Sequence, residues 1–309
     1  MMRVLVTGGS GRLGRSVVQV LAERGHEVVS VDAAEGSAAV REHVIDCADP
    51  GALASVIAAE RPEAVVALAA IAVPFSAPEA VILRQNVALV SALLEATMRD
   101  GGVRTVIAAS SPTVLGYGAP HGWLPERLPL DEEEPRRPWN AYALSKLVVE
   151  EAMRSAGRSV GDRMRFVSFR PCYVIAPEEW RGAPTQQGHT VAERLADPDL
   201  SAPALFNYVD ARDAAAFLDL AVQAGPELPQ GDTFFVGAAD ALATRPLAEL
   251  LPRYVPGTEE LAAGLTGTAP AFSFAKAERV LGWRPQRSWR TELADSEQGD
   301  VQQGTEGAA

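Results

Sequence analysis

Short apolar segments alternate with longer amphipathic segments along the first half of the chain. Apolar, β-rich runs occupy residues 3–7, 27–32, 64–70, 103–111 and 165–171. Helical patterns lie between them at residues 11–25, 80–102 and 141–157. Strands that are apolar throughout and separated by helices are typical of a parallel sheet with helices on both faces. The pattern therefore predicts an α/β fold built on a doubly wound parallel sheet.

The pattern becomes less regular after residue 170. A helix is predicted at 208–225 and a late strand at 232–238. We expect residues 1–170 to form a large domain to which 207–237 returns, with 171–206 and 238–293 forming a small C-terminal substrate lobe. Residues 294–309 are polar and Gly-rich, and we expect a disordered tail there.

Composition narrows the function classes. The 309 residues include 28 basic and 40 acidic side chains, a net charge of −12, which disfavours nucleic acid and anionic membrane surfaces as partners. No uncharged apolar run approaches the length of a membrane span, and the first residues form a strand rather than a signal peptide. Cys47 and Cys172 lack metal-ligand spacing, so we expect reduced thiols, no bound metal and a cytoplasmic protein.

A glycine-rich turn follows the first predicted strand. Gly8, Gly11 and Gly14 separate that strand from the first helix with the spacing G-x-x-G-x-x-G. Such a turn lets a pyrophosphate approach backbone N–H groups and the positive end of a helix. The strand before it and the helix after it predict a dinucleotide site, so the large domain is expected to be of the Rossmann type.

Two carboxylates follow the next strands. Asp32 ends the second strand, where it can accept hydrogen bonds from the adenosine ribose and repel a 2′-phosphate, so NAD is favoured over NADP. Arg12 and Arg41 are candidates for binding a 2′-phosphate and leave that alternative open. Asp46 either meets the adenine edge or caps the helix that follows Pro50.

A tyrosine and a lysine lie one helical turn apart in the segment "YALSK", as Tyr142 and Lys146. Near a nicotinamide, the tyrosine can move the hydroxyl proton of a carbinol, because a neighbouring ammonium stabilises its phenolate. Ser111 ends the predicted strand 103–111, and the carboxyl ends of parallel strands line the active-site crevice. We therefore expect Ser111 to hydrogen-bond the substrate oxygen and the tyrosine.

The chain resembles the extended short-chain dehydrogenases/reductases, also called the NAD-dependent epimerase/dehydratase family. The motifs that carry the resemblance span about 280 residues in the family's order. They are "TGGSGRLG" (7–14), Asp32, "LAA" (68–70), Asn86, "ASSPTVLG" (109–116), "PLDEEEP" (129–135), "YALSK" (142–146), "RP" (170–171), "NYVDARDAA" (207–215) and "KAERVLGWRP" (276–285).

The resemblance implies roles for these residues. Ser111, Tyr142 and Lys146 match the catalytic triad, and Ser110 fits the serine position less well. Asn86 is either a proton-relay residue or a polar group that bonds neighbouring backbone. A homodimer through the helices around 86–99 and 142–155 is expected. The implied NAD-binding residues are Gly8, Gly11, Arg12, Leu13, Gly14, Asp32, Asp46, Leu68, Ala69, Ala70, Asn86, Tyr142, Lys146 and Tyr173.

The chain departs from the family pattern near the substrate. Leu115 replaces a tyrosine often found there, and Tyr117 is an open candidate for its place. The stretch 171–208 is short, and it shows no segments that would clamp the nucleotide of a nucleotide sugar. In this compact second lobe the chain resembles, more loosely, the uronate dehydrogenases.

Other side chains near these segments have two interpretations each. An anionic substrate group would need an arginine with bidentate reach, whereas an ordinary surface ion pair is the alternative. Trp139 either walls the site or packs under the loop, and His121 lies in a loop. Asp210 and Asp213 are expected to orient the start of a helix. The candidate arginines are Arg136, Arg137, Arg181 and Arg212.

Three functions follow from these features. The first is an NAD-dependent oxidoreductase acting on a carbinol or carbonyl carbon of a sugar or sugar acid. The second is a nucleotide-sugar epimerase in which NAD is reduced only transiently. The third, a non-catalytic NAD-sensing protein, is disfavoured because the Tyr/Lys pair is present. Pro112 and Thr113 do not supply the Asp-Glu pair of dehydratases.

Overall fold

A parallel sheet forms the centre of the molecule. The computed structural model describes residues 1–36, 40–99 and 101–294. Within them the sheet has seven strands in the order β3-β2-β1-β4-β5-β6-β9, and every neighbouring pair is parallel. The strands are β1 (Arg3–Thr7), β2 (Glu27–Asp32), β3 (Arg41–Val44), β4 (Ala64–Ala67), β5 (Thr105–Ala109), β6 (Arg165–Pro171) and β9 (Thr233–Val236). This confirms the predicted Rossmann-type, doubly wound sheet.

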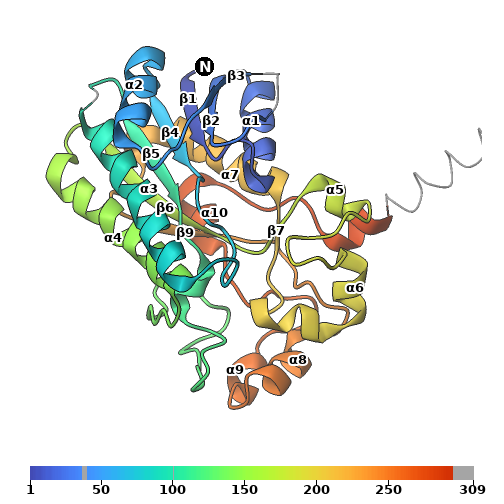
Figure 1. Ribbon diagram of the computed structural model, residues 1–309. Helices are drawn as coiled ribbons and strands as arrows, with labels where there is room; N and C mark the ends of the chain where they lie inside the picture. Colours follow the sequence, from blue (N-terminus) through green and yellow to red (C-terminus); the bar gives the residue numbers. More distant parts are fainter. Residues whose placement is uncertain (37–39, 100, 295–309) are drawn as a thin grey trace, which may run out of the picture.

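Helices cover both faces of the sheet (Figure 1). Alternate residues of β1 point to opposite faces: Val4 and Val6 join the core under α1 and α7, whereas Leu5 joins the core under the other helices. Both sides of the strand are therefore apolar, as the run "RVLVT" indicated. The helices are α1 (Arg12–Glu23) and α7 (Ala211–Ala224) on one face, and α2 (Pro50–Glu60), α3 (Glu79–Arg99) and α4 (Ala141–Val160) on the other.

The edge strand β3 was not predicted from the apolar pattern. Its sequence, Arg-Glu-His-Val, is exposed or half-buried throughout, because β3 pairs with β2 on one side and borders no further strand. An edge strand buries too little surface to need apolar residues. Backbone pairing with β2, and not an apolar sequence, therefore makes residues 41–44 a strand.

Helix α3 is long and apolar enough to cross a membrane by length and composition. Core helices of globular proteins meet the same criteria. In this fold α3 packs against α2 and α4, and it buries side chains such as Ile82, Val90 and Leu93. These contacts account for its apolar composition.

Smaller elements form a lobe beside the carboxyl ends of the strands (Figure 1). A two-stranded parallel sheet joins β7 (Val174–Ile175) to β8 (Val209–Asp210). The short helices there are α5 (Pro177–Trp180), α6 (Val191–Ala196), α8 (Leu247–Tyr254) and α9 (Glu259–Ala262), with 3₁₀ turns η2 (Pro198–Leu200) and η3 (Ala202–Ala204). A further 3₁₀ turn, η4 (Gly225–Glu227), follows α7 at the amino ends of β5 and β6.

The segment after α9 returns to the large sheet. Helix α10 (Ala275–Leu281) packs against β9 and α7. Residues 289–294 are helical. The predicted disordered tail, 294–309, lies outside the described residues except for Ala294.

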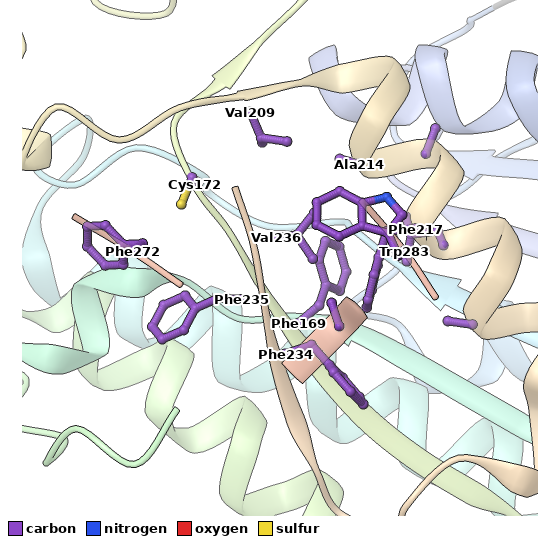
Figure 2. Packing of buried hydrophobic residues seen from close by; sticks show 14 of the residues in the cluster. Phe169, Cys172, Val209, Ala214, Phe217, Phe234, Phe235, Val236, Phe272 and Trp283 are labelled. Atoms are coloured by element: carbon purple, nitrogen blue, oxygen red, sulfur yellow. The ribbon is translucent and has the colours of Figure 1, made fainter. Parts of the chain in front are cut away.

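Aromatic side chains fill the core between α7, β6, β9 and α10 (Figure 2). The ring of Phe217 lies 5.9 Å from Phe169 and 5.7 Å from Trp283, centroid to centroid. On the other side of β9, Phe235 and Phe272 are 5.4 Å apart. Phe272 also contacts the ring of Tyr117, so this aromatic packing extends to the loop after β5.

The long loop 112–140 begins with a 3₁₀ turn, η1 (Pro112–Leu115). Its far end is attached to the C-terminal part of the chain, because Leu130 forms a parallel bridge with Phe272. Two backbone hydrogen bonds, from Leu130 to Ala271 and from Ser273 to Leu130, form this bridge. The loop thus links β5 to elements far away in the sequence.

Candidate active site

A cleft of about 780 Å³ opens between the carboxyl ends of the strands and the small lobe. This volume is in the range of small-molecule and cofactor sites. All of the predicted catalytic and NAD-binding residues except Asn86 line it. They are Gly8, Gly11, Arg12, Leu13, Gly14, Asp32, Asp46, Leu68, Ala69, Ala70, Ser111, Tyr142, Lys146 and Tyr173.

The glycine turn leaves no room for side chains. Gly8 has φ +75°, and a Cβ there would lie 2.6 Å from the backbone nitrogen of Ala69. A Cβ on Gly14 would lie 2.0 Å from the carbonyl oxygen of Gly8. Contacts below 3.0 Å with backbone cannot be relieved by a rotamer change. Glycines at these two positions therefore let the turn pack tightly against the loop after β4 and against the start of α1.

Helix α1 presents uncapped N–H groups at this turn. Side chains cap the first turns of α2, α4 and α7, through Asp49, Asn140 and Asp210. Helix α1 starts after Gly11 with no side-chain cap and no acidic residue in its first turn. Its first N–H groups have no acceptor within the helix. They supply the donors and the partial positive charge that suit an anionic cofactor, so the residues present fit NAD.

Arg12 connects this turn to the small lobe. Its guanidinium forms an ion pair with Glu179 in α5. Burial raises the pKa of Glu179, and the Ala176 N–H group and Arg12 offset part of that rise. Arg15 forms a second ion pair, 2.6 Å from Glu178. Arg41 instead pairs with Glu60 at 2.7 Å and does not line the cleft.

The carboxylates of Asp32 and Asp46 are held by different hydrogen bonds. Asp32 Oδ2 accepts a hydrogen bond from the Ser10 N–H group at 3.0 Å, and Oδ1 accepts one from Ala33 at 2.6 Å. Asp46 accepts one from the Ala48 N–H group at 2.9 Å. Of the two interpretations of Asp46, the helix cap is wrong, because Asp49 caps α2.

Tyr142 and Lys146 lie in the first turns of α4, at the centre of the cleft. Lys146 Nζ donates a 3.0 Å hydrogen bond to the carbonyl oxygen of Ala109 and lies 5.8 Å from the centroid of the tyrosine ring. Burial lowers the pKa of Lys146 to about 8. Burial also raises the pKa of Tyr142 to about 12, and hydrogen bonding with Ser111 acts in the opposite direction.

Ser111 is oriented by its neighbour in η1. The Thr113 N–H group and the Thr113 hydroxyl both donate to Ser111 Oγ, at 3.3 and 2.9 Å. Two donors directed at this oxygen leave its own O–H group to donate elsewhere. Ser111 can therefore donate to the tyrosine or to a substrate oxygen beside it.

Ser110 has a different environment. Its hydroxyl donates to Glu150 Oε1 at 2.7 Å, and Glu150 also accepts hydrogen bonds from Arg170 at 2.7 and 3.0 Å. Burial acts to raise the pKa of Glu150, but Arg170 and Ser110 hold it below its ordinary value. This buried cluster ties β5, α4 and β6 together beneath the site.

Asn86 bonds backbone rather than lining the cleft. Its side chain accepts from the Ile71 N–H group at 2.8 Å, donates to the Ile71 carbonyl and donates to Ser145 Oγ at 3.0 Å. These contacts fix the loop after β4 against α3 and α4. The position matches the interpretation of Asn86 as a polar group that bonds neighbouring backbone.

Some of the candidate substrate-recognition residues line the cleft and others do not. Tyr117 lines the cleft, whereas Leu115 is fully buried in the core. Burial raises the pKa of Tyr117, and hydrogen bonding with Asn207 offsets part of the rise. Trp139 also lines the cleft, and its Nε1 donates to the Tyr117 carbonyl oxygen at 3.1 Å. The sequence named Tyr117 and Trp139 as candidates but did not decide whether either residue lines the site.

None of the four candidate arginines lines the cleft. Arg136 pairs with Glu151, Arg137 with Glu126, and Arg212 with Asp210 and Glu292. Arg181 and His121 are likewise absent from its described lining. The ion-pair interpretation therefore holds for three of the arginines.

Two aspartates, at the end of β8 and in the first turn of α7, support the scaffold. Asp210 caps α7 by accepting from the Arg212 N–H group at 2.7 Å, as predicted. Asp213 accepts from the N–H groups of Gln286 and Arg287 instead, both at 2.8 Å. Its role is to hold the C-terminal segment rather than to orient the helix start.

Several residues of the cleft were not predicted. Phe75 lies in the loop between β4 and α3, and Gln186, Gln187 and Asn207 come from the small lobe. Phe75, Gln186 and Gln187 belong to irregular segments with no spacing signal. Asn207 begins the motif "NYVDARDAA", but that motif gave it no role at the site.

The chain matches the family model described as "NAD dependent epimerase/dehydratase family" over residues 4–237. A UDP-glucose 4-epimerase of Azospirillum brasilense is 34% identical over 172 residues, 52% of this chain and 46% of that protein. A 2'-dehydrokanamycin reductase of Streptomyces kanamyceticus is 32% identical over 159 residues, 50% of this chain and 38% of that protein. The chain thus spans less than half the length of either relative.

A solved structure shares the fold over the whole chain. It is a short-chain dehydrogenase/reductase superfamily protein from Agrobacterium tumefaciens with bound NAD. The TM-score is 0.70 at 24% identity, and the match covers 99% of both chains. At this identity the likeness establishes the fold alone.

Proposed function

Because the chain belongs to the NAD-dependent epimerase/dehydratase family, we propose that it is an oxidoreductase that transfers a hydride at a carbinol or carbonyl carbon of a sugar-like substrate. Tyr142 is the acid and base of this reaction, Lys146 stabilises its phenolate, and Ser111 binds the reacting oxygen. The cofactor of the family is NAD.

The observation that carries the proposal is the arrangement of three side chains at one point of the cleft. Tyr142 and Lys146 share a helix face, and Ser111 approaches from the end of β5. In the oxidation direction, NAD supplies the hydride acceptor. Tyr142 Oη takes the substrate hydroxyl proton, and the ammonium of Lys146 favours the phenolate electrostatically. Ser111 donates to the substrate oxygen and fixes its distance from the tyrosine.

The surroundings of the cleft support a cofactor in a defined orientation. The uncapped start of α1 suits the pyrophosphate, and Asp32 suits the adenosine ribose. Asp32 also disfavours a 2′-phosphate, which supports NAD over NADP. In this proposal Arg12, Leu13, Asp46, Leu68, Ala69, Ala70 and Tyr173 complete the cofactor contacts.

An epimerase is the second candidate. The relative from Azospirillum brasilense is named a UDP-glucose 4-epimerase, whereas the one from Streptomyces kanamyceticus is named a reductase. A dehydrogenase and an epimerase both begin by transferring a hydride from the substrate carbinol to NAD, and they differ in whether the oxidised substrate stays and turns over. A reductase runs the first transfer in the opposite direction. The same three residues would serve either outcome.

The test is to mix purified protein with NAD and a panel of hexoses, hexuronates and nucleotide sugars while recording absorbance of NADH. Accumulation of NADH with one substrate supports the oxidoreductase. Product isomers without NADH support the epimerase instead. Tyr142→Phe is the control, and we expect it to lower the rate by about 10²–10⁴-fold. Unchanged turnover in that variant would contradict the proposed role of the tyrosine.

We also propose a cytoplasmic homodimer. Cys47 and Cys172 are both free and buried, which suits a reducing compartment. Helices α3 and α4 pack together, and Leu144 on α4 is 41% exposed. A second copy would cover this surface. Light scattering should then report twice the mass of one chain, and Leu144→Arg should shift that value toward the monomer.

A further inference from the structure

The charges that line the cleft are unevenly distributed. Of the described residues that line it, those with a formal charge are Arg12, Asp32, Asp46 and Lys146. The first three lie at the glycine turn and at the ends of β2 and β3. Lys146 belongs to the centre, beside Tyr142. We call the part of the lining outside the predicted catalytic and cofactor-binding residues the outer half. It consists of uncharged side chains, among them Phe75, Tyr117, Trp139, Gln85, Gln186 and Gln187.

Arg194, an arginine beside this lining, is committed to other groups. Arg194 is 2% exposed, lies 4.3 Å above the ring of Tyr173 and donates to Gln187, Thr185 and the Leu200 carbonyl. Its guanidinium thus supports the wall of the outer half from behind. A carboxylate or diphosphate bound in this half would lose water without gaining a cation from the described lining.

The outer half instead offers aromatic surface. Phe75 is 61% exposed, and its ring lies 5.7 Å from that of Trp139, centroid to centroid. Trp139 is held by the hydrogen bond to Tyr117. Phe75 also has φ +61°, a conformation that is rare for a large side chain. Two large rings held at the mouth of a cleft form a surface for the apolar face of a ligand.

We propose that the substrate is uncharged: a neutral sugar or similar cyclic polyol whose apolar ring face lies on Phe75 and Trp139. Side-chain amides such as Gln85 and Gln186 bind its hydroxyl groups from α3 and from the small lobe. This inference rests on the proposed hydride transfer for the reacting carbon, and it excludes both hexuronates and nucleotide sugars as the preferred substrate.

The test compares ligands that share a ring and differ in charge. Galactose, galacturonate and UDP-galactose form one series, and glucose and mannose with their charged counterparts form two more. Binding to the Tyr142→Phe protein saturated with NAD is measured by calorimetry, so that no turnover is needed. We expect at least one neutral sugar to bind about tenfold more tightly than its charged counterparts. A panel in which no neutral sugar does so, including one without any binding, overturns the inference.

The same design separates the two proposals. Tight binding of a neutral sugar without NADH formation or isomerisation by the unsubstituted protein would contradict the proposed function and keep this inference. Turnover confined to a hexuronate or a nucleotide sugar would do the reverse.

A pair of variants tests the aromatic surface. Phe75→Asn removes the ring and retains a residue that tolerates positive φ. We expect KM for the neutral sugar to rise about tenfold with kcat within about twofold. Val280→Ala, at a side chain that is 38% exposed and outside the described cleft lining, is the control and should change neither. Equal KM values in the Phe75 variant and the unsubstituted protein would refute the role of the ring.

Discussion

The two halves of the cleft are built by different means. The half that suits the nucleotide consists of a glycine turn, an uncapped helix start and carboxylates at strand ends. The outer half consists of large rings and amides from irregular segments, with no formal charge in its described lining. Backbone geometry thus defines the first half, and side-chain surface defines the second. A cofactor common to a family needs the former, whereas a particular substrate is selected by the latter.

The largest effect is expected from breaking the nucleotide half. Gly14→Ala places a Cβ 2.0 Å from the Gly8 carbonyl oxygen, so the turn must open. We expect NAD affinity to fall about 100-fold or more, equivalent to about 3 kcal/mol. Fluorescence titration with NADH measures this. Gly101→Ala is the control, because a Cβ there meets nothing within 4 Å. Equal affinities in the two variants would show that the turn does not hold the cofactor.

The second prediction concerns Lys146, where the two halves meet. Burial lowers its pKa to about 8, whereas an unfolded lysine titrates near 10.4. Between these values the unfolded chain binds more protons, so the free energy of unfolding rises with pH in that window. Lys146→Met abolishes this rise and should stabilise the cofactor-free protein at pH 7 by up to about 3 kcal/mol.

Denaturant titration of both proteins at pH 7 and pH 9.5 measures this effect. The same variant should lose activity by about 10²–10⁴-fold. Tyr142 adds the opposite slope at higher pH, because its folded pKa of about 12 exceeds the unfolded value, so stability declines above about pH 10. If Lys146→Met is less stable than the unsubstituted protein at pH 7, burial of the charged Lys146 ammonium does not destabilise the fold, and the prediction is wrong.

The smallest effect sharpens the nucleotide half without breaking it. Asp32→Asn keeps the shape of the side chain and removes the charge that disfavours a 2′-phosphate. We expect the preference for NAD over NADP to fall about tenfold, as measured by kcat/KM with each cofactor. Asp46→Asn is the matched control and should leave the ratio nearly unchanged. If the NAD/NADP ratio changes more in the Asp46 variant than in the Asp32 variant, Asp46 rather than Asp32 is the carboxylate that disfavours the 2′-phosphate.

The sequence predicted the regular parts of the molecule and the backbone half of the cleft. Strands β2 and β6 were expected at their observed bounds, because both are apolar runs bounded by turns. The glycine spacing and the Tyr142/Lys146 pair are local signals within one turn of helix or loop. Phe75 and Gln186 carried no such signal, because they are far apart in the sequence and only the tertiary fold brings both to the cleft. For Asn86 the sequence left two interpretations open, because a family position does not reveal whether a side chain points to the cleft or to backbone.

Asp213 fastens the C-terminal segment to the start of α7. It accepts the N–H groups of Gln286 and Arg287, and its carbonyl oxygen accepts from Trp283 Nε1 at 3.1 Å. The nascent chain therefore carries the glycine turn and the first six strands long before residues 283–287 arrive to close the aromatic core behind β9. During synthesis the part of the core around Phe217 and Trp283 is therefore completed last, after every residue that lines either half of the cleft has left the ribosome.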